Sequence, residues 1–327
     1  MIRIGICGYG NVGSALEQII KLHKDMKLMV IFSRRNIKAN SNIKVVNTKN
    51  ILEWKKLLDV LILANGSKKD LPTEGPLVAQ YFNTVDSYDN HSNMLNYYEA
   101  MDKASKKGKK LSIIAAGWDP GKFSKERIEA SAYYPDGKIK TFWGDGISEG
   151  HTNAIKEFNK MFNKNWIIDA IQYTHPIINA IRLAKEGKAD NLTLREQHSR
   201  ECFIAVTDDA NKDFIINWIT KMPHYYDEYD TIIKFVSKEE IKEKEKEMNH
   251  KGLVIAYGLS IDNNPQLQEY KLDLSSNPEH TARILIAYAR SNYRLNKEGK
   301  IGSIPSICVP VDKLHPDSLK TLIKTLV

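Results

Sequence analysis

The chain has 327 residues, of which 42% are hydrophobic and 27% are charged, a balance typical of a globular protein long enough for two domains. No segment approaches the roughly 20 consecutive apolar residues that a membrane span requires, so we expect no membrane embedding. The formal net charge is +8, but no basic run is interleaved with aromatic residues, so we expect no nucleic-acid partner.

The N-terminus and the cysteines both indicate a cytoplasmic protein. The opening residues, MIRIGICGYGNVG, become glycine-rich where a signal peptide would need an unbroken apolar region. Cys7, Cys202 and Cys308 are odd in number and widely separated, which is not the spacing of a zinc site or a redox motif. We therefore predict that these cysteines are structural and that the protein has no metal site.

The N-terminal third alternates short β-branched runs with amphipathic stretches. This alternation predicts parallel strands joined by crossover helices in a doubly wound sheet. The expected strands are Ile2–Cys7, Lys27–Phe32, Ile43–Val46, Val60–Ala64, Thr84–Asp86 and Leu111–Ala115. The expected helices are Ser14–His23, Ile51–Leu58 and Met94–Lys106.

A glycine motif, Gly8-Tyr9-Gly10-Asn11-Val12-Gly13, follows the first expected strand and begins a helix. This context is typical of a Rossmann-type dinucleotide-binding domain. Gly8 permits a tight turn, Gly10 lets the backbone approach a pyrophosphate, and Gly13 lets the helix pack closely on the strand. The alternative is a glycine-rich turn that binds nothing.

The second expected strand ends in Ser33-Arg34-Arg35, at a position where NAD-dependent enzymes place an acid. Guanidinium groups can bind the 2′-phosphate of NADP through charge-assisted hydrogen bonds, and a hydroxyl can add a further contact. The alternative is two surface arginines at the end of a strand. Because the glycine motif lies at the expected distance before these residues, we predict NADP as the cofactor.

Two further strand ends are expected at the same crevice, since ligands of open parallel sheets bind at the carboxyl ends of the strands. They are Ala64-Asn65-Gly66-Ser67 and Ser87-Tyr88-Asp89. Each composition also fits a simple turn.

After about residue 116 the runs become longer and several alternate, which predicts a mostly antiparallel sheet that carries helices. These runs are Ile139–Trp143, Ile167–Thr174, Arg200–Val206 and Gly252–Ser260.

Three segments follow a different pattern in the C-terminal part. Lys238–Lys251 is nearly all charged and fits either a solvated helix or a loop. Asn277, Pro278 and Glu279 have the composition of a helix cap and first turn, so we expect a buried helix to about Leu295. The pattern of residues 316–327 predicts a short amphipathic helix, which could pack back on the first domain.

Eight strings spread over most of the chain together resemble the meso-diaminopimelate D-dehydrogenases. In chain order they are GYGNVG, FSRR, TVDSYDNH, AAGWDPGKFS, TFWGDGISEGH, QYTHP, QHSRECF and SSNPEHTA. The resemblance implies a reversible NADP-dependent oxidative deamination of the D-centre of meso-2,6-diaminopimelate, which yields L-2-amino-6-oxopimelate and ammonia. It also implies a homodimer and a role in the biosynthesis of lysine and cell-wall precursors.

The expected fold class is therefore α/β, with a Rossmann-type doubly wound parallel sheet domain and an α+β substrate and dimerisation domain. The first domain is expected to comprise residues 1–118 and about 278–327, and the second about 119–277. The second should contain the mostly antiparallel sheet.

The resemblance also assigns site residues. Cofactor contacts fall on Gly8, Tyr9, Gly10, Asn11, Val12, Gly13, Ser33, Arg34, Arg35, Ala64, Asn65, Gly66, Ser67, Ser87, Tyr88, Asp89, Ala116, Gly117, Trp118, Asp119 and Pro120. Substrate contacts fall on Asp89, Asp119, Trp143, Glu149, Gly150, Thr174, Arg200, His250 and Asn277.

The chemistry of these residue types agrees with a substrate that carries two carboxylates and two ammonium groups. Arg200 can bind one carboxylate bidentately, and Thr174, His250 and Asn277 can hydrogen-bond the distal amino-acid end. Asp89 and Asp119 can hold the reacting ammonium group, and we expect one of them to be the catalytic base. Trp143 can form a flat wall beside the reacting carbon.

Each of these residues also has a simpler interpretation. Trp143 fits a strand core, Arg200 a surface ion pair, Asp119 a turn, His250 a surface position and Asn277 a helix cap.

The family commonly has glutamine at the position of Glu149 and methionine at that of Lys122, so the fine substrate specificity stays open. The alternatives for the whole chain are a broad-specificity D-amino-acid dehydrogenase, another two-domain NAD(P)-dependent amino-acid dehydrogenase, and an NADP-sensing protein without catalysis.

Overall fold

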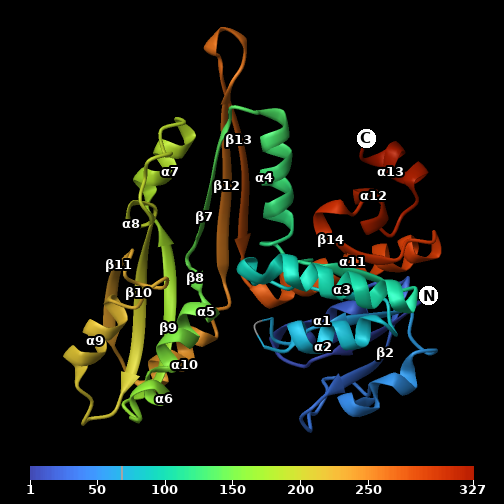
Figure 1. The fold of residues 1–327 in the computed structure, drawn as a ribbon, viewed down its shortest axis with the longest axis horizontal. Coiled ribbons are helices and arrows are strands. Elements are labelled where there is room, and N and C mark those ends of the chain that lie inside the picture. Colours follow the sequence, from blue (N-terminus) through green and yellow to red (C-terminus); the bar gives the residue numbers. More distant parts are fainter. Residues whose placement is uncertain (68) are drawn as a thin grey trace. The chain divides into compact units, whose positions relative to one another are not determined.

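The computed structural model describes residues 1–67 and 69–327, except for the side chain of Glu149. The chain divides into two compact units. The first unit comprises Met1–Lys125 and Pro278–Val327, and the second unit comprises Glu126–Asn277. The helix α4, Lys122–Tyr133, spans the first boundary between them. Figure 1 shows the elements of both units, many of them with the labels used below.

The first unit is built on a sheet of seven strands within its described residues, and every pairing in it is parallel. The strand order is β14-β6-β5-β4-β1-β2-β3. Without β14, this is the order of a doubly wound dinucleotide-binding sheet. The strands are β1 Ile2–Cys7, β2 Met26–Ser33, β3 Val45–Asn47, β4 Val60–Leu63, β5 Thr84–Asp86, β6 Leu111–Ile114 and β14 Gly302–Pro305.

Helices cover both faces of this sheet, because successive strand residues are apolar and point to opposite sides. Ile31 belongs to a core with α1 and α11, whereas its neighbours Val30 and Phe32 belong to a core with α2 and α3. The helical segments of this unit are α1 Asn11–Ile20, η1 Thr48–Trp54, α2 Leu71–Ala79, η2 His91–Asn93, α3 Met94–Gly108, α11 Asn277–Lys297, η4 Ser306–Cys308, α12 Val311–Leu314 and α13 Leu319–Thr325.

The second unit holds two sheets within its described residues. One has the order β11-β10-β9-β8 and the other β13-β12-β7. Only β10 and β11 pair in parallel among the recorded pairings of these residues, so the mostly antiparallel sheet is confirmed. The strands are β7 Lys138–Gly144, β8 Gly146–Ile147, β9 Ile167–Pro176, β10 His198–Val206, β11 Asp230–Phe235, β12 His250–Leu259 and β13 Pro265–Leu274.

Three apolar clusters hold the second unit together. Phe158, Ile215 and Ile219 from α6 and α9 pack on one face of the sheet that contains β9 and β10. Ile241 of α10 packs with Phe203 on the other face. α7 packs on the β12 sheet through its alanines. The helical segments are α5 Glu149–Lys156, α6 Phe158–Phe162, α7 Ile178–Lys185, α8 Leu194–Gln197, α9 Lys212–Thr220, α10 Lys238–Glu245 and η3 Ile261–Asn263.

The charged run is a helix over its first part. α10 begins with a capping box between Ser237 and Glu240, which satisfies the first backbone N–H groups, and it buries Ile241. Within α11, Leu285, Ile286 and Ala289 are buried, which confirms the prediction of a buried helix.

The expected C-terminal helix is present as α13 and belongs to the first unit, but its side chains remain largely exposed. α13 has no buried residue, and Leu319 and Ile323 are each more than half exposed. Seven residues that include two lysines offer little apolar area to bury. The chain just before α13 is instead held by Arg294, whose guanidinium donates hydrogen bonds to the carbonyl oxygens of His315 and Pro316.

Within residues 1–67 and 69–327, every helix falls short of the length or the hydropathy that crossing a membrane requires.

Candidate functional site

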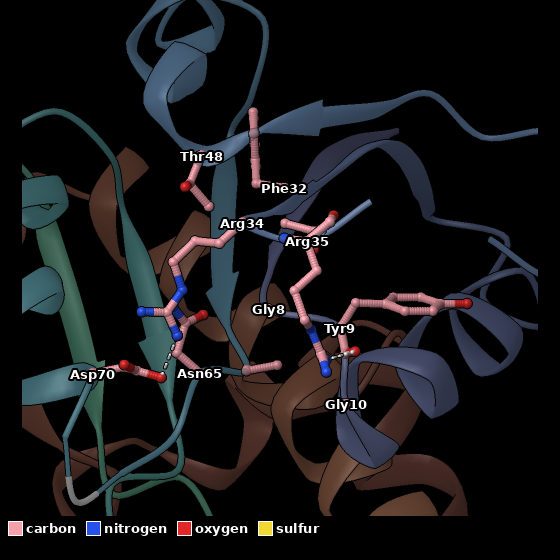
Figure 2. A pocket seen from close by; sticks show the side chains of 11 residues that line it. Gly8, Tyr9, Gly10, Phe32, Arg34, Arg35, Thr48, Asn65 and Asp70 are labelled. Carbon is pink, nitrogen blue, oxygen red and sulfur yellow. Dashed lines mark hydrogen bonds and ion pairs between the residues drawn. The ribbon is translucent and has the colours of Figure 1, made fainter. Parts of the chain in front are cut away.

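A hollow of about 170 Å³ lies in the first unit at the carboxyl ends of β1, β2 and β4. Figure 2 shows it from close by, with the glycine turn on one side and two arginines reaching across it. Its lining residues are Gly8, Tyr9, Gly10, Phe32, Ser33, Arg34, Arg35, Thr48, Ala64, Asn65 and Asp70. The structure thus brings three of the predicted cofactor segments together in one place.

The glycine turn has the geometry that a nucleotide site needs. Gly8 has a φ of 98°, which L side chains rarely adopt, and a Cβ on Gly13 would lie 2.4 Å from the carbonyl oxygen of Gly8. The helix α1 therefore packs directly against the turn. It begins at Asn11, and Val12 is its second residue. A Cβ on Gly10 would meet nothing within 4 Å, so the backbone here is open to a ligand.

Arg34 lies at the edge of the hollow and is shared between two acids at the start of α2. Its Nη2 lies 2.9 Å from Oδ2 of Asp70, and its Nη1 lies 3.3 Å from Oε1 of Glu74. The hydrogen bond to Asp70 raises the pKa of the guanidinium. Because the arginine is largely exposed, such pairs contribute only about 0–1 kcal/mol, and a phosphate group can compete for the same donors.

Arg35 extends across the hollow toward the glycine turn. Its Nη2 donates a hydrogen bond of 3.3 Å to the carbonyl oxygen of Tyr9, as Figure 2 shows. The hydroxyl of Ser33 donates to the carbonyl oxygen of Arg35 at 2.9 Å and accepts from its N–H at 3.1 Å. Ser33 therefore fixes the turn from which both arginines extend.

The two remaining predicted cofactor segments follow the neighbouring strands β5 and β6 and do not line the hollow. One oxygen of Asp86, Oδ1, accepts hydrogen bonds from the N–H of Tyr88 at 3.0 Å and from that of Ala115 at 3.4 Å. This buried carboxylate thereby joins the two segments. The residues of these segments are Ser87, Tyr88 and Asp89 after β5, and Ala116, Gly117, Trp118, Asp119 and Pro120 after β6.

Sequence reasoning missed three polar residues near the hollow. Asn47 at the end of β3 pairs with Ser33, so Thr48 lies one residue beyond a strand end, and the strand-end rule would have found it. Asp70 and Glu74 lie at the start of α2, a helix that is hard to predict from the sequence because its prolines and glycine disfavour helix formation.

Two further predicted cofactor residues follow Asn65. Gly66 donates its N–H to Asp70 at 3.3 Å, and Ser67 is the last described residue before residue 68.

In the second unit, Arg200 and Thr174 lie directly opposite each other on β10 and β9. The Nη1 of Arg200 donates a hydrogen bond to the hydroxyl of Thr174. Only 7% of Arg200 is exposed, and burial lowers the pKa of its guanidinium. The carbon Cζ lies 4.0 Å from the ring centroid of Tyr229, a residue that sequence reasoning missed.

No acid in the described part of the chain forms an ion pair with Arg200, and its Nε–H has no hydrogen-bond partner there. A buried cation without a counter-ion is costly, and buried arginines are normally paired. This arrangement is therefore suited to an incoming anion such as a carboxylate, which an arginine binds through two parallel hydrogen bonds.

Trp143 is held by a second residue that sequence reasoning missed, His198. The backbone N–H of Trp143 donates to Nε2 of His198 at 3.2 Å, and the two rings stack with centroids 5.9 Å apart. Burial, together with the charge of Arg200, lowers the pKa of His198 to about 4, so the ring is neutral at pH 7 and can accept this bond. Trp143 is 38% exposed as a whole residue.

His250 lies against β8, which pairs with the strand that carries Thr174, and Asn277 is bonded to the segment just before His250. A Cβ on Gly146 would come within 2.8 Å of the ring of His250, and Gly146 pairs with Thr174. The glycine thus lets the histidine approach β8. The N–H of Asn277 donates to the carbonyl oxygen of Met248 at 2.8 Å, two residues before His250.

Glu149 begins α5, and its side chain lies outside the described part of the structure. Gly150 follows it, and a Cβ there would meet nothing within 4 Å. Lys122, the other position at which the chain departs from the common family pattern, begins α4. Among the described residues, no group of three histidine, cysteine, aspartate or glutamate side chains is arranged to hold a metal ion.

Comparisons with known proteins match the C-terminal half of the chain to a family model and nearly the whole chain to single relatives. The family model of the diaminopimelic acid dehydrogenase C-terminal domain matches residues 117–276. A meso-diaminopimelate D-dehydrogenase of Ureibacillus thermosphaericus is 41% identical over 328 residues, which cover 99% of each chain.

Two solved structures are similar to this one over its full length. The diaminopimelate dehydrogenase of Corynebacterium glutamicum in complex with DAP has a TM-score of 0.92 and 34% identity, and the match covers 100% of this chain and 99% of that one. An engineered D-amino acid dehydrogenase bound to NADP⁺ has a TM-score of 0.88 and 33% identity, with the same coverage.

Proposed function

The chain belongs to the meso-diaminopimelate D-dehydrogenase family, and we propose that it catalyses the NADP-dependent oxidative deamination of the D-centre of meso-2,6-diaminopimelate. The products are L-2-amino-6-oxopimelate, which can cyclise to tetrahydrodipicolinate, and ammonia. The relative from Corynebacterium glutamicum was solved in complex with DAP, and another similar structure was solved with NADP⁺.

The observation that carries the proposal is the buried guanidinium of Arg200. It shares the interior of the second unit with the hydroxyl of Thr174 and has no acidic partner among the described residues. A substrate carboxylate would supply the missing negative charge. We assign to the same substrate site Trp143, Glu149, Gly150, His250 and Asn277, together with Asp89 and Asp119.

NADP fits the hollow of the first unit. The open backbone at Gly10 suits a pyrophosphate, and Arg34 and Arg35 would bind the 2′-phosphate, which NAD lacks. The residues at the ends of β4, β5 and β6 would follow the cofactor toward its nicotinamide ring. When bound, NADP⁺ supplies the acceptor for a hydride from the substrate carbon.

The residues of the chain are left with proton transfer and orientation. The D-centre can lose a hydride only after its ammonium group loses a proton, because the nitrogen lone pair must form the imine. We assign that proton to Asp119 or Asp89, directly or through water. Water then adds to the imine carbon, and ammonia leaves, so one water is consumed for each ketone formed.

Domain roles, assembly and location complete the proposal. We assign NADP binding to residues 1–118 and about 278–327, and substrate binding and dimerisation to about 119–277. A homodimer in the cytoplasm is expected from the family resemblance. Light scattering on the purified protein would measure a mass near twice that of the 37.3 kDa chain.

A panel of isomers tests the reaction. The purified protein is mixed with NADP⁺ and, separately, with the meso, LL and DD isomers of diaminopimelate, and NADPH formation is followed. We expect a strong signal with the meso isomer alone. Equal rates with simple D-amino acids would favour the broad-specificity alternative, and no reduction with any amino acid would favour an NADP-sensing protein.

A further inference from the structure

The ring of Tyr229 lies against the guanidinium of Arg200, with 4.0 Å between the ring centroid and Cζ. Tyr229 immediately precedes β11, and β11 runs parallel to β10 with Thr231 opposite Arg200. The strand register therefore fixes where the tyrosine meets the arginine. This contact plays no part in the family resemblance described above.

The buried positive charge of Arg200 can be stabilised by an aromatic ring. Burial removes water from the guanidinium, and among the described residues its polar contacts include the hydroxyl of Thr174 and both the ring face and the hydroxyl of Tyr229. A cation over a desolvated aromatic face gains about 2 kcal/mol. The ring can therefore offset part of the cost of keeping the charge buried before a ligand arrives.

An acid in the same place would do something different. It would bind the N–H groups of Arg200 in the guanidinium plane, which are the groups that a substrate carboxylate needs. An aromatic ring instead covers the flat face and leaves the edge of the guanidinium available. The ring thus holds the side chain in one orientation, and the uncharged tyrosine competes less with a ligand for the N–H groups than an acid would.

We propose that Tyr229 is a positioning residue for substrate binding, and that its ring face holds Arg200 ready for one carboxylate of the substrate. The inference rests on the proposed role of Arg200. It predicts that the ring of Tyr229 contributes more to substrate affinity than its hydroxyl group, which also hydrogen-bonds the guanidinium.

Two substitutions of Tyr229 separate the ring from simple space filling. Y229F keeps the aromatic face, whereas Y229L removes it and retains an apolar side chain. We expect Y229L to raise the KM for meso-diaminopimelate about tenfold or more, as the loss of a desolvated cation–π contact implies. We expect Y229F, which keeps the ring and loses only the hydroxyl, to raise this KM clearly less than Y229L does, and the KM for NADP to be unchanged in both. If Y229L is too unstable to purify, Y229M serves in its place.

A double-substitution cycle connects the effect to the arginine. R200M should raise the KM for the substrate strongly, and adding Y229L to R200M should change it no further. An equal loss in Y229F, an unchanged KM in Y229L, or an additional loss in the double variant would each overturn the inference. If R200M itself left the KM unchanged, the proposed role of Arg200 would fail, and the inference with it.

Discussion

The hydroxyl of Tyr97 donates a hydrogen bond of 2.8 Å to Oδ2 of Asp86, and both side chains are buried in the first unit. The ring of Tyr97 also stacks on Tyr88, with centroids 4.0 Å apart. The other oxygen of Asp86 binds the N–H groups of Tyr88 and Ala115. One carboxylate therefore joins α3 to the two segments that carry Asp89 and Asp119.

The first prediction concerns pH and stability. Burial raises the pKa of Asp86 to about 6, although three hydrogen bonds oppose the shift. Between about pH 4 and pH 6 the folded protein keeps a proton that the unfolded chain releases, so this group lowers the stability as the pH rises. D86N cannot ionise at this position. As the pH is raised from 4 to 7, its unfolding free energy should therefore rise by about 3 kcal/mol relative to that of the parent.

Urea unfolding of D86N and the parent protein at several pH values measures this difference directly. A constant difference in unfolding free energy between pH 4 and pH 7 would show that Asp86 does not titrate as described.

The second prediction has the opposite sign. His198 is neutral in the folded protein, because its pKa is lowered to about 4, whereas the unfolded chain takes up a proton near pH 6.5. Its contribution to stability is therefore present above pH 6.5 and is lost as the pH falls toward 4. Through this group the parent should lose about 2 kcal/mol of unfolding free energy between pH 7.5 and pH 5. H198Q should not show this loss, because glutamine cannot be protonated.

Chemical denaturation of H198Q and the parent at these two pH values provides the measurement. The substrate KM of H198Q should also rise at pH 7.5 if the stacked histidine orients Trp143. The same acid sensitivity in H198Q as in the parent would rule out this histidine as its source.

The third prediction concerns cofactor choice. R34A and R35A should each raise the KM for NADP about 10- to 100-fold, since a charge-assisted hydrogen bond contributes about 1.5–3 kcal/mol. The KM for NAD should change far less, because NAD lacks the 2′-phosphate. R182A is a matched control, because Arg182 forms a surface pair with Glu186 in the second unit and should affect neither cofactor. Equal losses for both cofactors would contradict the assignment.

The fourth prediction concerns the base. D119N should lower turnover by about 10²- to 10⁴-fold and remove one limb of the pH profile, because the amide cannot accept the ammonium proton. D89N, made in parallel, should have the smaller effect if Asp119 is the base and the larger effect if Asp89 is. Turnover and a pH profile that stay unchanged in D119N would exclude Asp119.

The first unit could be predicted well from the sequence, because its strands are buried on both faces and appear as short β-branched runs. The six predicted N-terminal strands are confirmed to within about two residues. The expected helix Ile51–Leu58 is wrong, since the structure has the 3-10 helix Thr48–Trp54 there. α2 was not predicted because Pro72, Gly75 and Pro76 disfavour a helix in local terms.

The supporting residues of the candidate site could not be predicted in the same way. Arg200 and Tyr229 are 29 positions apart, and their contact depends on the register between β10 and β11. The bond from Trp143 to His198 likewise joins strands of two different sheets. Local patterns carry no information on such pairings, whereas the glycine motif and the arginine pair are local in sequence and therefore visible.

Isotope transfer tests the central claim most directly. meso-Diaminopimelate carrying deuterium only at the D-configured α-carbon is incubated with the enzyme and NADP⁺, and the NADPH formed is analysed by mass spectrometry. The account predicts one deuterium in the reduced nicotinamide, and none when the label is at the L-configured carbon. Unlabelled NADPH from the first substrate, or labelled NADPH from the second, would contradict it.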